Sequence, residues 1–236
     1  MKIILFTLLS ACAWGQIESP QIGVMLDVTG RARPVLGAPA AAVAGAPWFD
    51  GGVISLACSA AGCVAKTESA LFTSSGVVVD APPGAAIIAL DATSPGAAYI
   101  YFVESGTLAR WTGSQLVPMD FAPVGDVLAL RAVAGGFEYV VERDGEIWIG
   151  GKSLGAANSV LLLDGGGALL ASGGQVRLLR PDGTEADFAV APEGSFVGGF
   201  IRMSDQYVQV ITGSGMWALD LEPGHERIFL LPGAAH

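Results

Sequence analysis

Few residues in this chain could do acid–base or nucleophilic chemistry. Its two histidines, His225 and His236, both lie near the C-terminal end. A Ser-His-Asp arrangement would have to use His225, which stands in a Glu-Pro-Gly-His-Glu turn. A zinc site needs several His or Cys ligands, and the sequence does not supply such a set. We therefore expect no metal site and no bound cofactor.

Glycoside hydrolysis is the one kind of catalysis that the sequence still allows, because it needs only two acidic side chains roughly 5–10 Å apart. Three acids stand just before apolar runs, where one mouth of the predicted fold would gather them, and an amide and two aromatic residues stand in equivalent loops. The candidate ligand-binding residues are Trp48, Phe49, Asp50, Asp126, Asn158 and Glu193. The alternative roles of these residues are loop solvation, turn capping and the covering of a sheet edge.

A second set of residues emerges when the repeating units of the chain are aligned. The residues that end successive apolar runs are Cys58, Asp91, Arg131, Asp164 and Arg202. Acidic and basic residues alternate over the last four. If these runs line a channel, the four charges form a ring at one mouth, which suits a zwitterionic or anionic ligand. Alternatively, neighbouring charges simply neutralise one another at a narrow opening.

Cys58 and Cys63 flank a Ser-Ala-Ala-Gly turn between two predicted strands, so their side chains can face one another. We expect a disulfide between them if the protein is exported. A redox or metal-binding pair is the alternative. The C-x4-C spacing is not that of thioredoxin-like motifs, and no histidine lies nearby.

The elements that must position these residues are hairpins that recur along the chain. Their turns centre near Gly30, Ser69, Gly106, Gly145, Gly174 and Gly215, mostly about 40 residues apart. Apolar runs precede most of the turns and begin at Val53, Ile87, Val127, Val160 and Phe196. Weaker runs follow several of them. Short runs separated by Gly- and Asp-Gly-type turns are typical of antiparallel meanders, so the chain is predicted to be all-β.

In period and strand order the chain resembles the β-propeller superfamily, loosely in the manner of secreted bacterial propellers, from about Gln21 to Pro232. The signature sequences of named propeller families are absent. The resemblance implies a single propeller of about six four-stranded antiparallel blades, with five and seven as alternatives. It also implies ligands or partners at the channel mouths, but no particular activity and no catalytic residues.

The two ends of the chain are predicted to close the ring. The first unit begins directly with its hairpin at Ile22, whereas the segment Arg227–Leu231 resembles the apolar runs that open the other units. We expect this C-terminal strand to pair beside Ile22–Val28, which would leave no exposed edges. The alternative is that it forms the outer strand of the last blade.

The beginning of the chain is typical of an export signal, with Lys2 before an apolar core and small residues after it. We expect a signal peptide over residues 1–15 and a propeller domain over residues 16–236. Cleavage before Cys12, which would become a lipid anchor, is an alternative. The predicted location is periplasmic, secreted or associated with the outer envelope. No apolar run reaches the roughly 18 residues of a membrane-spanning helix.

Charge and composition favour a binding protein over an enzyme. The net charge of −10 argues against nucleic acid and anionic membranes as partners. Trp111, Trp148 and Trp217 occupy equivalent third strands, which predicts a place in the core. We expect a monomeric, non-catalytic binding or scaffold protein that recognises an envelope or extracellular protein or glycan. The alternative is a carbohydrate-active enzyme, a glycosidase or lyase, with carboxylates at a channel mouth.

Overall fold

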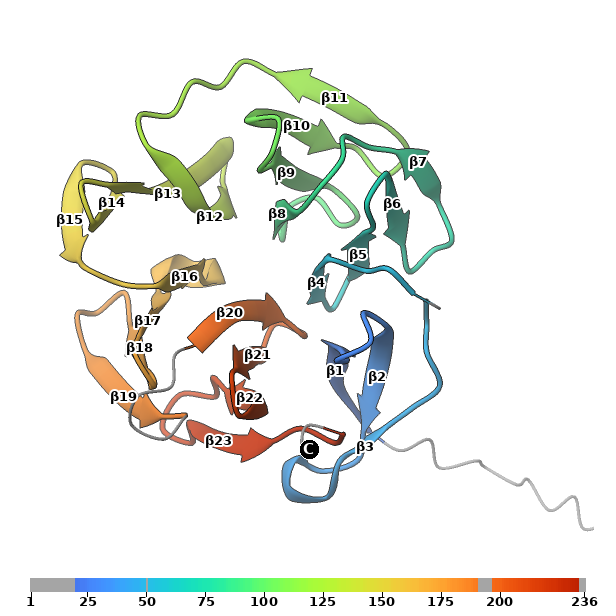
Figure 1. Ribbon diagram of the computed structural model, residues 1–236, viewed down its shortest axis with the longest axis vertical. Helices are drawn as coiled ribbons and strands as arrows, with labels where there is room; N and C mark the ends of the chain where they lie inside the picture. The colour runs from blue at the N-terminus through green and yellow to red at the C-terminus, as the bar shows by residue number, and fades with distance from the viewer. Residues whose placement is uncertain (1–19, 50, 191–196, 234–236) are drawn as a thin grey trace, which may run out of the picture.

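The chain is an all-β protein with the architecture of a single β-propeller. The computed structural model describes residues 20–49, 51–190 and 197–233. Its sheets stand side by side around a central axis (Figure 1). The predicted fold class is therefore confirmed. Over the same residues, no helix is long and apolar enough to cross a membrane.

The first sheet consists of β1 (Gln21–Leu26), β2 (Ala32–Leu36) and β3 (Val43–Ala44), with the short 3-10 helix η1 (Pro39–Ala41) before β3. Five four-stranded antiparallel units follow it along the chain. The first two contain β4 (Ser55–Ser59), β5 (Gly62–Lys66), β6 (Ala70–Thr73), β7 (Val78–Asp80), β8 (Ala86–Leu90), β9 (Ala98–Phe102), β10 (Thr107–Trp111) and β11 (Leu116–Met119).

The remaining three units follow the same order from the axis to the rim. They contain β12 (Asp126–Val133), β13 (Gly136–Arg143), β14 (Glu146–Ile149), β15 (Lys152–Gly155), β16 (Ser159–Leu162), β17 (Ala168–Ser172), β18 (Gln175–Leu179), β19 (Glu185–Ala189), β20 (Val197–Arg202), β21 (Tyr207–Thr212), β22 (Gly215–Asp220) and β23 (Arg227–Leu230). A second 3-10 helix, η2 (Asp164–Gly166), connects β16 to β17.

Local sequence explains why these strands form where they do. The segment AYIYF of β9 is buried at all five positions, as expected for a strand covered on both faces. Asp144 and Gly145 connect β13 to β14 with φ angles of 55° and 79°. Two successive left-handed residues give a tight turn that matches the twist of a hairpin, which is why the sequence has Asp-Gly there.

The predicted number of about six four-stranded blades is wrong. Four sheets with four or more strands surround the axis, and one of them has eight strands because β20 pairs in parallel with β4 at Arg202 and Ala57. The first sheet has only three strands. The physical reason is that its unit has no inner apolar run, so the inner strands β4, β8, β12, β16 and β20 contact one another around the axis without it.

The predicted pairing of Arg227–Leu231 beside Ile22–Val28 is also wrong. Strand β23 pairs with β22 along Trp217–Asp220 and is the outer strand of the last unit. A short turn brings β23 back to the free edge of β22, its neighbour in sequence, whereas β1 lies at the other end of the chain. Side chains still connect the two ends, because Leu231 packs with Ile22 and Met25 in one buried cluster.

The first sheet lies between the last unit and the β4–β7 unit, and both of its faces are buried. Ile22, Met25 and Val35 pack against Met203 and Met216 on one side, whereas Val24 and Ala32 pack against Val53 and Leu56 on the other. Similar apolar clusters fill the other junctions. Trp111 lies in one, and Trp148 and Trp217 pack against two others, so their predicted place in the core is confirmed.

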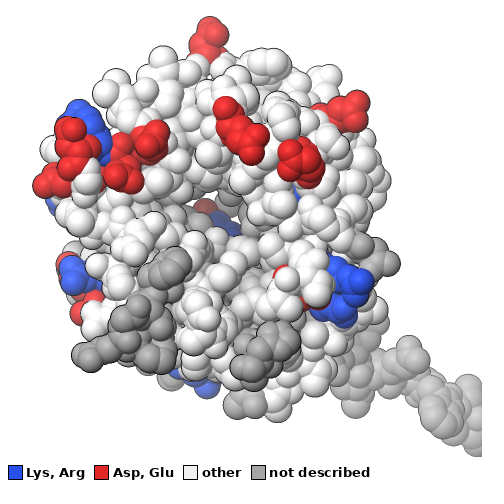
Figure 2. All heavy atoms as spheres, viewed as in Figure 1, with Lys and Arg blue, Asp and Glu red and all other residues white. Residues whose placement is uncertain are grey.

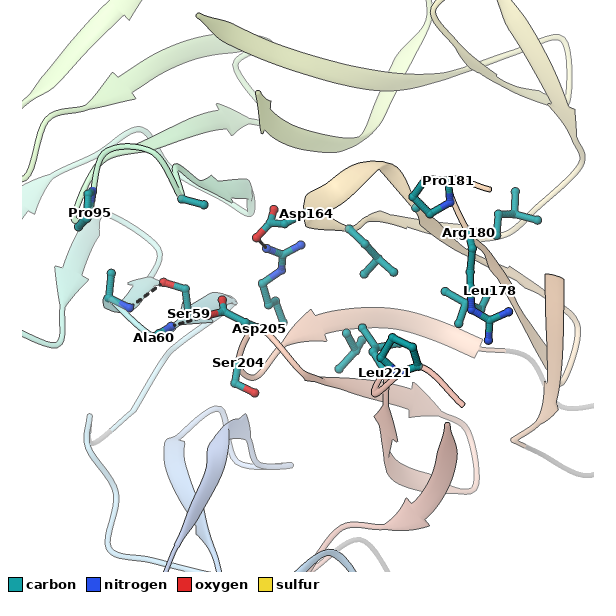
Figure 3. A pocket seen from close by; sticks show the side chains of 18 residues that line it. Ser59, Ala60, Pro95, Asp164, Leu178, Arg180, Pro181, Ser204, Asp205 and Leu221 are labelled. Atoms are coloured by element: carbon teal, nitrogen blue, oxygen red, sulfur yellow. Dashed lines mark hydrogen bonds and ion pairs between the residues drawn. The ribbon is translucent and has the colours of Figure 1, made fainter. Parts of the chain in front are cut away.

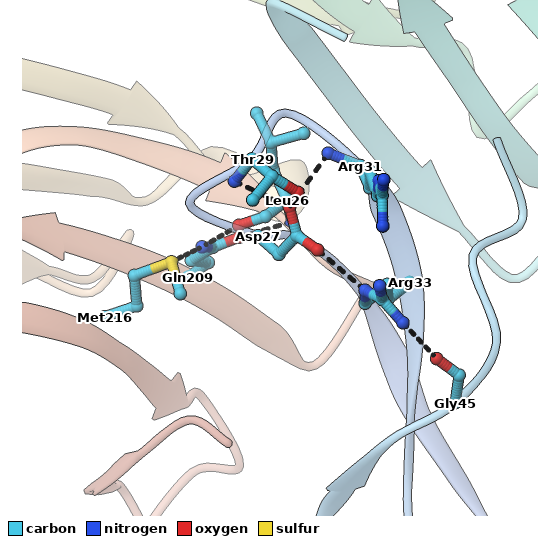
Figure 4. A network of polar contacts seen from close by, with 8 residues as sticks. All are labelled: Leu26, Asp27, Thr29, Arg31, Arg33, Gly45, Gln209 and Met216. Carbon is cyan, nitrogen blue, oxygen red and sulfur yellow. Dashed lines mark hydrogen bonds and ion pairs between the residues drawn. The ribbon is translucent and has the colours of Figure 1, made fainter. Parts of the chain in front are cut away.

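The inner edge of β1 has no neighbouring strand, and other groups occupy its hydrogen bonds. The N–H of Val24 donates to the carbonyl oxygen of Met203 (3.1 Å). The side-chain amide of Gln209 on β21, which is fully buried, accepts from the N–H of Leu26 (2.9 Å) and donates to its carbonyl oxygen (2.8 Å) (Figure 4). Gln209 thus takes the place of a strand residue.

Beyond Leu26, the turn between β1 and β2 is organised by the carboxylate of Asp27. This carboxylate accepts hydrogen bonds from the N–H and the hydroxyl of Thr29 and from the N–H of Arg31. It also forms an ion pair with Arg33, whose Nε lies 2.6 Å from Oδ2. Burial alone would raise the pKa of Asp27, but these hydrogen bonds outweigh it and lower the pKa from 3.8 to about 2. Arg33 also donates to the carbonyl oxygen of Gly45 (3.0 Å), which ties β2 to the following loop (Figure 4).

The predicted disulfide between Cys58 and Cys63 is present. The two residues face one another across the β4–β5 hairpin, and both are buried. The bond closes the turn at the end of β4, next to the parallel pairing of β4 with β20.

Replacement of Gln209 by Leu is expected to lower the free energy of unfolding by about 2–4 kcal/mol, because it leaves the N–H and carbonyl of Leu26 buried without partners. Urea denaturation measures this change. Gln175→Leu is the matched control, since Gln175 is exposed at the start of β18. A loss of stability equal to that of the control would contradict the conclusion that Gln209 replaces the backbone partner of Leu26.

The Asp27 carboxylate predicts a pH dependence. Its folded pKa lies below its unfolded pKa, so its contribution is complete above about pH 4 and is lost as the pH falls toward 2. We expect Asp27→Asn to cost about 1–2 kcal/mol at pH 6 and progressively less between pH 4 and pH 2. Denaturant titrations at several pH values test this, with the exposed Asp187→Asn as control. A cost that is independent of pH would contradict it.

Candidate functional site

The candidate site is a hollow of about 600 Å³ at the mouth where the inner strands end. We call it the mouth hollow and define it by Ala60, Pro95, Asp164, Pro181, Arg202 and Pro223. Figure 3 shows Pro95 and Ala60 on one side, Pro181 and Leu178 on the other, and Asp164 between them. The loops after β4, β8, β16, β18, β20 and β22 all contribute, so the site depends on the ring arrangement of the fold.

The charged groups of the mouth hollow already have protein partners. Arg202 forms an ion pair with Asp164 and donates to the carbonyl oxygen of Leu162 (3.1 Å). The carboxylate of Asp205 accepts from the N–H of Ala60 (3.1 Å). These interactions fix the polar side chains in place and leave the apolar lining as the chief means of holding a ligand.

The apolar lining is aliphatic. It includes Leu178, Leu221, Pro95, Pro181 and Pro223, and none of the lining residues is aromatic. Sequence analysis did not single out these prolines, because each stands in a turn, where proline is common for local reasons. The available signal was that Ser-Pro-Gly, Arg-Pro-Asp-Gly and Glu-Pro-Gly turns all follow strands that end at the same mouth.

The predicted ring of Asp91, Arg131, Asp164 and Arg202 is only partly assembled. Asp164 and Arg202 meet in the mouth hollow. Asp91 instead lies near Arg110 of its own unit (3.6 Å) and caps the turn at Thr93, and Arg131 forms an ion pair with Glu138 across its own hairpin. A ligand-binding role for the four remains a prediction.

Two arginines hold the β16–β17 connection from both sides. The guanidinium of Arg131 on β12 donates to the carbonyl oxygens of Leu163 (2.9 Å) and Gly167 (3.2 Å). Arg202 on β20 reaches Leu162 and Asp164 from the opposite side. Three neighbouring units are therefore connected at this mouth by charge-assisted hydrogen bonds, which are stronger than neutral ones.

Trp48 and Phe49 lie between the first sheet and the β4–β7 unit. The N–H of Trp48 donates to the carbonyl oxygen of Ala32 (2.8 Å), and the ring of Phe49 packs on Phe72 with centroids 4.1 Å apart. Both side chains pack against a buried cluster. They cover the edge of the sheet here, and the binding role assigned to them stays a prediction.

The other candidates lie where the inner strands begin, at the opposite mouth. Asp126 is exposed at the start of β12, and Asn158 is exposed just before β16. Asp50 and Glu193 lie outside the described residues, as do Cys12 and the predicted signal peptide. Whether the predicted acids converge therefore stays open.

Between the two mouths runs a channel of about 370 Å³, lined by all the inner strands and by apolar side chains such as Leu128, Leu161 and Phe200. Figure 2 shows one face of the molecule, with acidic side chains mainly over its upper part and charged atoms of both signs visible inside a central opening. Within residues 20–49, 51–190 and 197–233, no group of three or more His, Cys, Asp or Glu side chains could hold a metal ion.

Comparison with known proteins shows the fold. No protein-family model matches the chain, and no curated protein sequence does. A chain of the nidogen/laminin complex has a TM-score of 0.58 at 13% identity and covers 88% of this chain and 93% of its own length. The WD40 repeats of RRP9 have a TM-score of 0.51 at 11% identity, with 93% and 83% covered.

PorZ, a bacterial surface component of the type-IX secretion system of Porphyromonas gingivalis, has a TM-score of 0.50 at 13% identity. The match covers 91% of this chain but only 38% of the PorZ chain. At such identities these similarities show a shared propeller fold and nothing about a shared activity.

The Arg131 interactions predict a stability effect. Arg131→Met is expected to lower the free energy of unfolding by about 1–3 kcal/mol, because the carbonyls of Leu163 and Gly167 lose a charged donor and keep only the backbone N–H groups of Gly166 and Leu163. Arg177→Met is the matched control, since Arg177 is half exposed in ion pairs with Glu185 and Asp187 and should matter by at most about 1 kcal/mol. Equal losses in urea denaturation would contradict the role of Arg131 between units.

Proposed function

We propose that the protein is an exported, non-catalytic binding propeller whose mouth hollow takes an apolar segment of a protein partner. The observation that carries this proposal is the lining of the hollow, in which proline, leucine and alanine surround charged groups that already have partners within the protein. A rigid concave apolar surface suits the insertion of an apolar side chain, which is how protein interfaces gain most of their energy.

The lining also favours a protein partner over a glycan at this mouth. A sugar ring presents C–H groups that pack well on aromatic faces, and the residues that line the mouth hollow include no aromatic side chain. Aliphatic side chains and prolines give no such face, but they pack well against leucine- or valine-like side chains.

Export is supported by the Cys58–Cys63 disulfide, because such bonds form and persist in oxidising compartments. It agrees with the export signal expected from residues 1–15. A lipid anchor at Cys12 would keep the propeller at a membrane surface, and signal-peptidase cleavage would release it.

The two carboxyl groups that line the mouth hollow favour binding over glycoside hydrolysis. Asp164 is ion-paired with Arg202, and Asp205 accepts a hydrogen bond from the N–H of Ala60. A general acid and a nucleophile or base for that reaction would have to be available to the sugar instead.

A synthetic library of short apolar peptides, screened beside a panel of polysaccharides, tests the proposal. The mature protein is expected to bind a subset of the peptides and to cleave none of the polysaccharides. Ala60→Trp, which fills the mouth hollow from an exposed turn position, is expected to weaken peptide binding at least about tenfold.

Ala189→Trp on the outer strand β19 is the matched control, because it adds the same ring at an exposed position outside the hollow. Turnover of any polysaccharide, absence of peptide binding, or equal binding by the Ala60→Trp variant and its control would each contradict the proposal.

A further inference from the structure

A second hollow, of about 650 Å³, lies along β13 and β14 and has a different chemistry. We call it the aromatic groove and define it by Val124, Phe137, Glu138, Tyr139, Arg143 and Trp148. From its geometry we infer that the aromatic groove is a binding site for an acidic carbohydrate, such as a uronate-containing oligosaccharide. This inference concerns a separate site and does not depend on the function proposed for the mouth hollow.

The aromatic side chains of the groove are held rigidly. Phe121 packs edge-on against Tyr139, with centroids 5.0 Å apart, and against Phe137 at 5.5 Å. Phe137 also packs on Tyr99 at 5.2 Å. Because the rings are already fixed, little conformational entropy is lost when a ligand stacks on them. Tyr139 remains 37% exposed, so part of this platform faces solvent.

The polar groups of the groove are available to a ligand. Among the hydrogen bonds of the described residues, none uses the Tyr139 hydroxyl, which can therefore donate to and accept from a sugar. Half-exposed Glu138 can accept from sugar hydroxyls with the part of its carboxylate that Arg131 does not use. Rigid rings beside such hydroxyl-binding groups match a sugar, which has an apolar C–H face and a polar edge.

The charge of the groove specifies an acidic ligand. The Arg143 guanidinium lies 4.6 Å from the centroid of the Trp148 ring, and no carboxylate of the described residues forms an ion pair with it. Arg131 and Glu138 neutralise one another, which leaves Arg143 as the uncompensated charge among the residues that line the groove. Glu142, Asp144 and Glu146 lie beside Arg143 on the same hairpin, outside the lining. A guanidinium oriented by stacking binds a carboxylate with two parallel hydrogen bonds.

The end of the groove is open, which suits a chain rather than a single sugar. Gly150 and Gly151 form the turn between β14 and β15, both with positive φ, and no atom lies within 4 Å of where a Cβ would stand on either. These two residues therefore place no side chain in the path of an oligosaccharide that extends past the turn.

Isothermal titration with trigalacturonate tests the inference, and the neutral galactose trisaccharide is the matched ligand. We expect the wild-type protein to bind trigalacturonate at least about tenfold more tightly than the neutral sugar, and more weakly as salt is raised. Arg143→Gln should abolish the preference for the acidic sugar, and Tyr139→Ala should weaken both sugars.

Two control variants and one folding check test whether the effects arise at the aromatic groove. Arg177→Gln removes an exposed arginine elsewhere and should bind as the wild type does. Ala60→Trp should also leave sugar binding unchanged, which separates this site from the mouth hollow. Circular dichroism confirms that each variant is folded.

Absence of binding, binding that neither Arg143→Gln nor Tyr139→Ala changes, or a preference for a triglutamate peptide over trigalacturonate would each overturn the inference. The last outcome would identify the groove as a site for acidic protein segments.

Discussion

The inner edge of β1 is the constraint on which the place of the first sheet in the ring depends. A strand whose backbone groups lack partners inside a protein is costly, and the first sheet has no inner strand to supply them. The carbonyl of Met203 and the side-chain amide of Gln209 fill that gap. Gly23 permits the approach, because a Cβ there would stand 2.5 Å from the Met203 oxygen. With this edge satisfied, a three-stranded sheet can occupy a place between two four-stranded units.

A small number of contacts also closes the ring of inner strands. Strands β20 and β4 meet in parallel at Arg202 and Ala57, and Arg202 also forms the ion pair in the mouth hollow. The closing of the ring and the shape of the mouth are thus connected through one residue. The disulfide at the end of β4 stiffens the other partner of this junction. The aromatic groove lies on a different unit, and Arg131 connects the two hollows, because it pairs with Glu138 in the groove and donates to the carbonyls of Leu163 and Gly167 beside the mouth hollow.

Much of the fold could be predicted from the sequence, because hairpin turns and apolar runs are local signals. The C-terminal strand was misplaced since an apolar run such as Arg227–Leu231 looks the same whether it lies at the axis or the rim. The charged ring was predicted from the ends of the inner runs, but Asp91 and Arg131 find partners within their own units at Arg110 and Glu138. That choice depends on strand register, which the sequence does not reveal. The aromatic groove likewise combines residues of several elements.

The placement of the first sheet has a consequence for how the molecule comes apart. The inner strands form a complete circle from β4 to β20, and the first sheet joins it by packing and by a few hydrogen bonds rather than by ladder pairing with an inner strand. Segments held in this way open as cooperative units below the free energy of global unfolding. The N-terminal sheet can therefore detach and return while the rest of the ring stays folded, exposing the apolar surfaces that it covers on both neighbours.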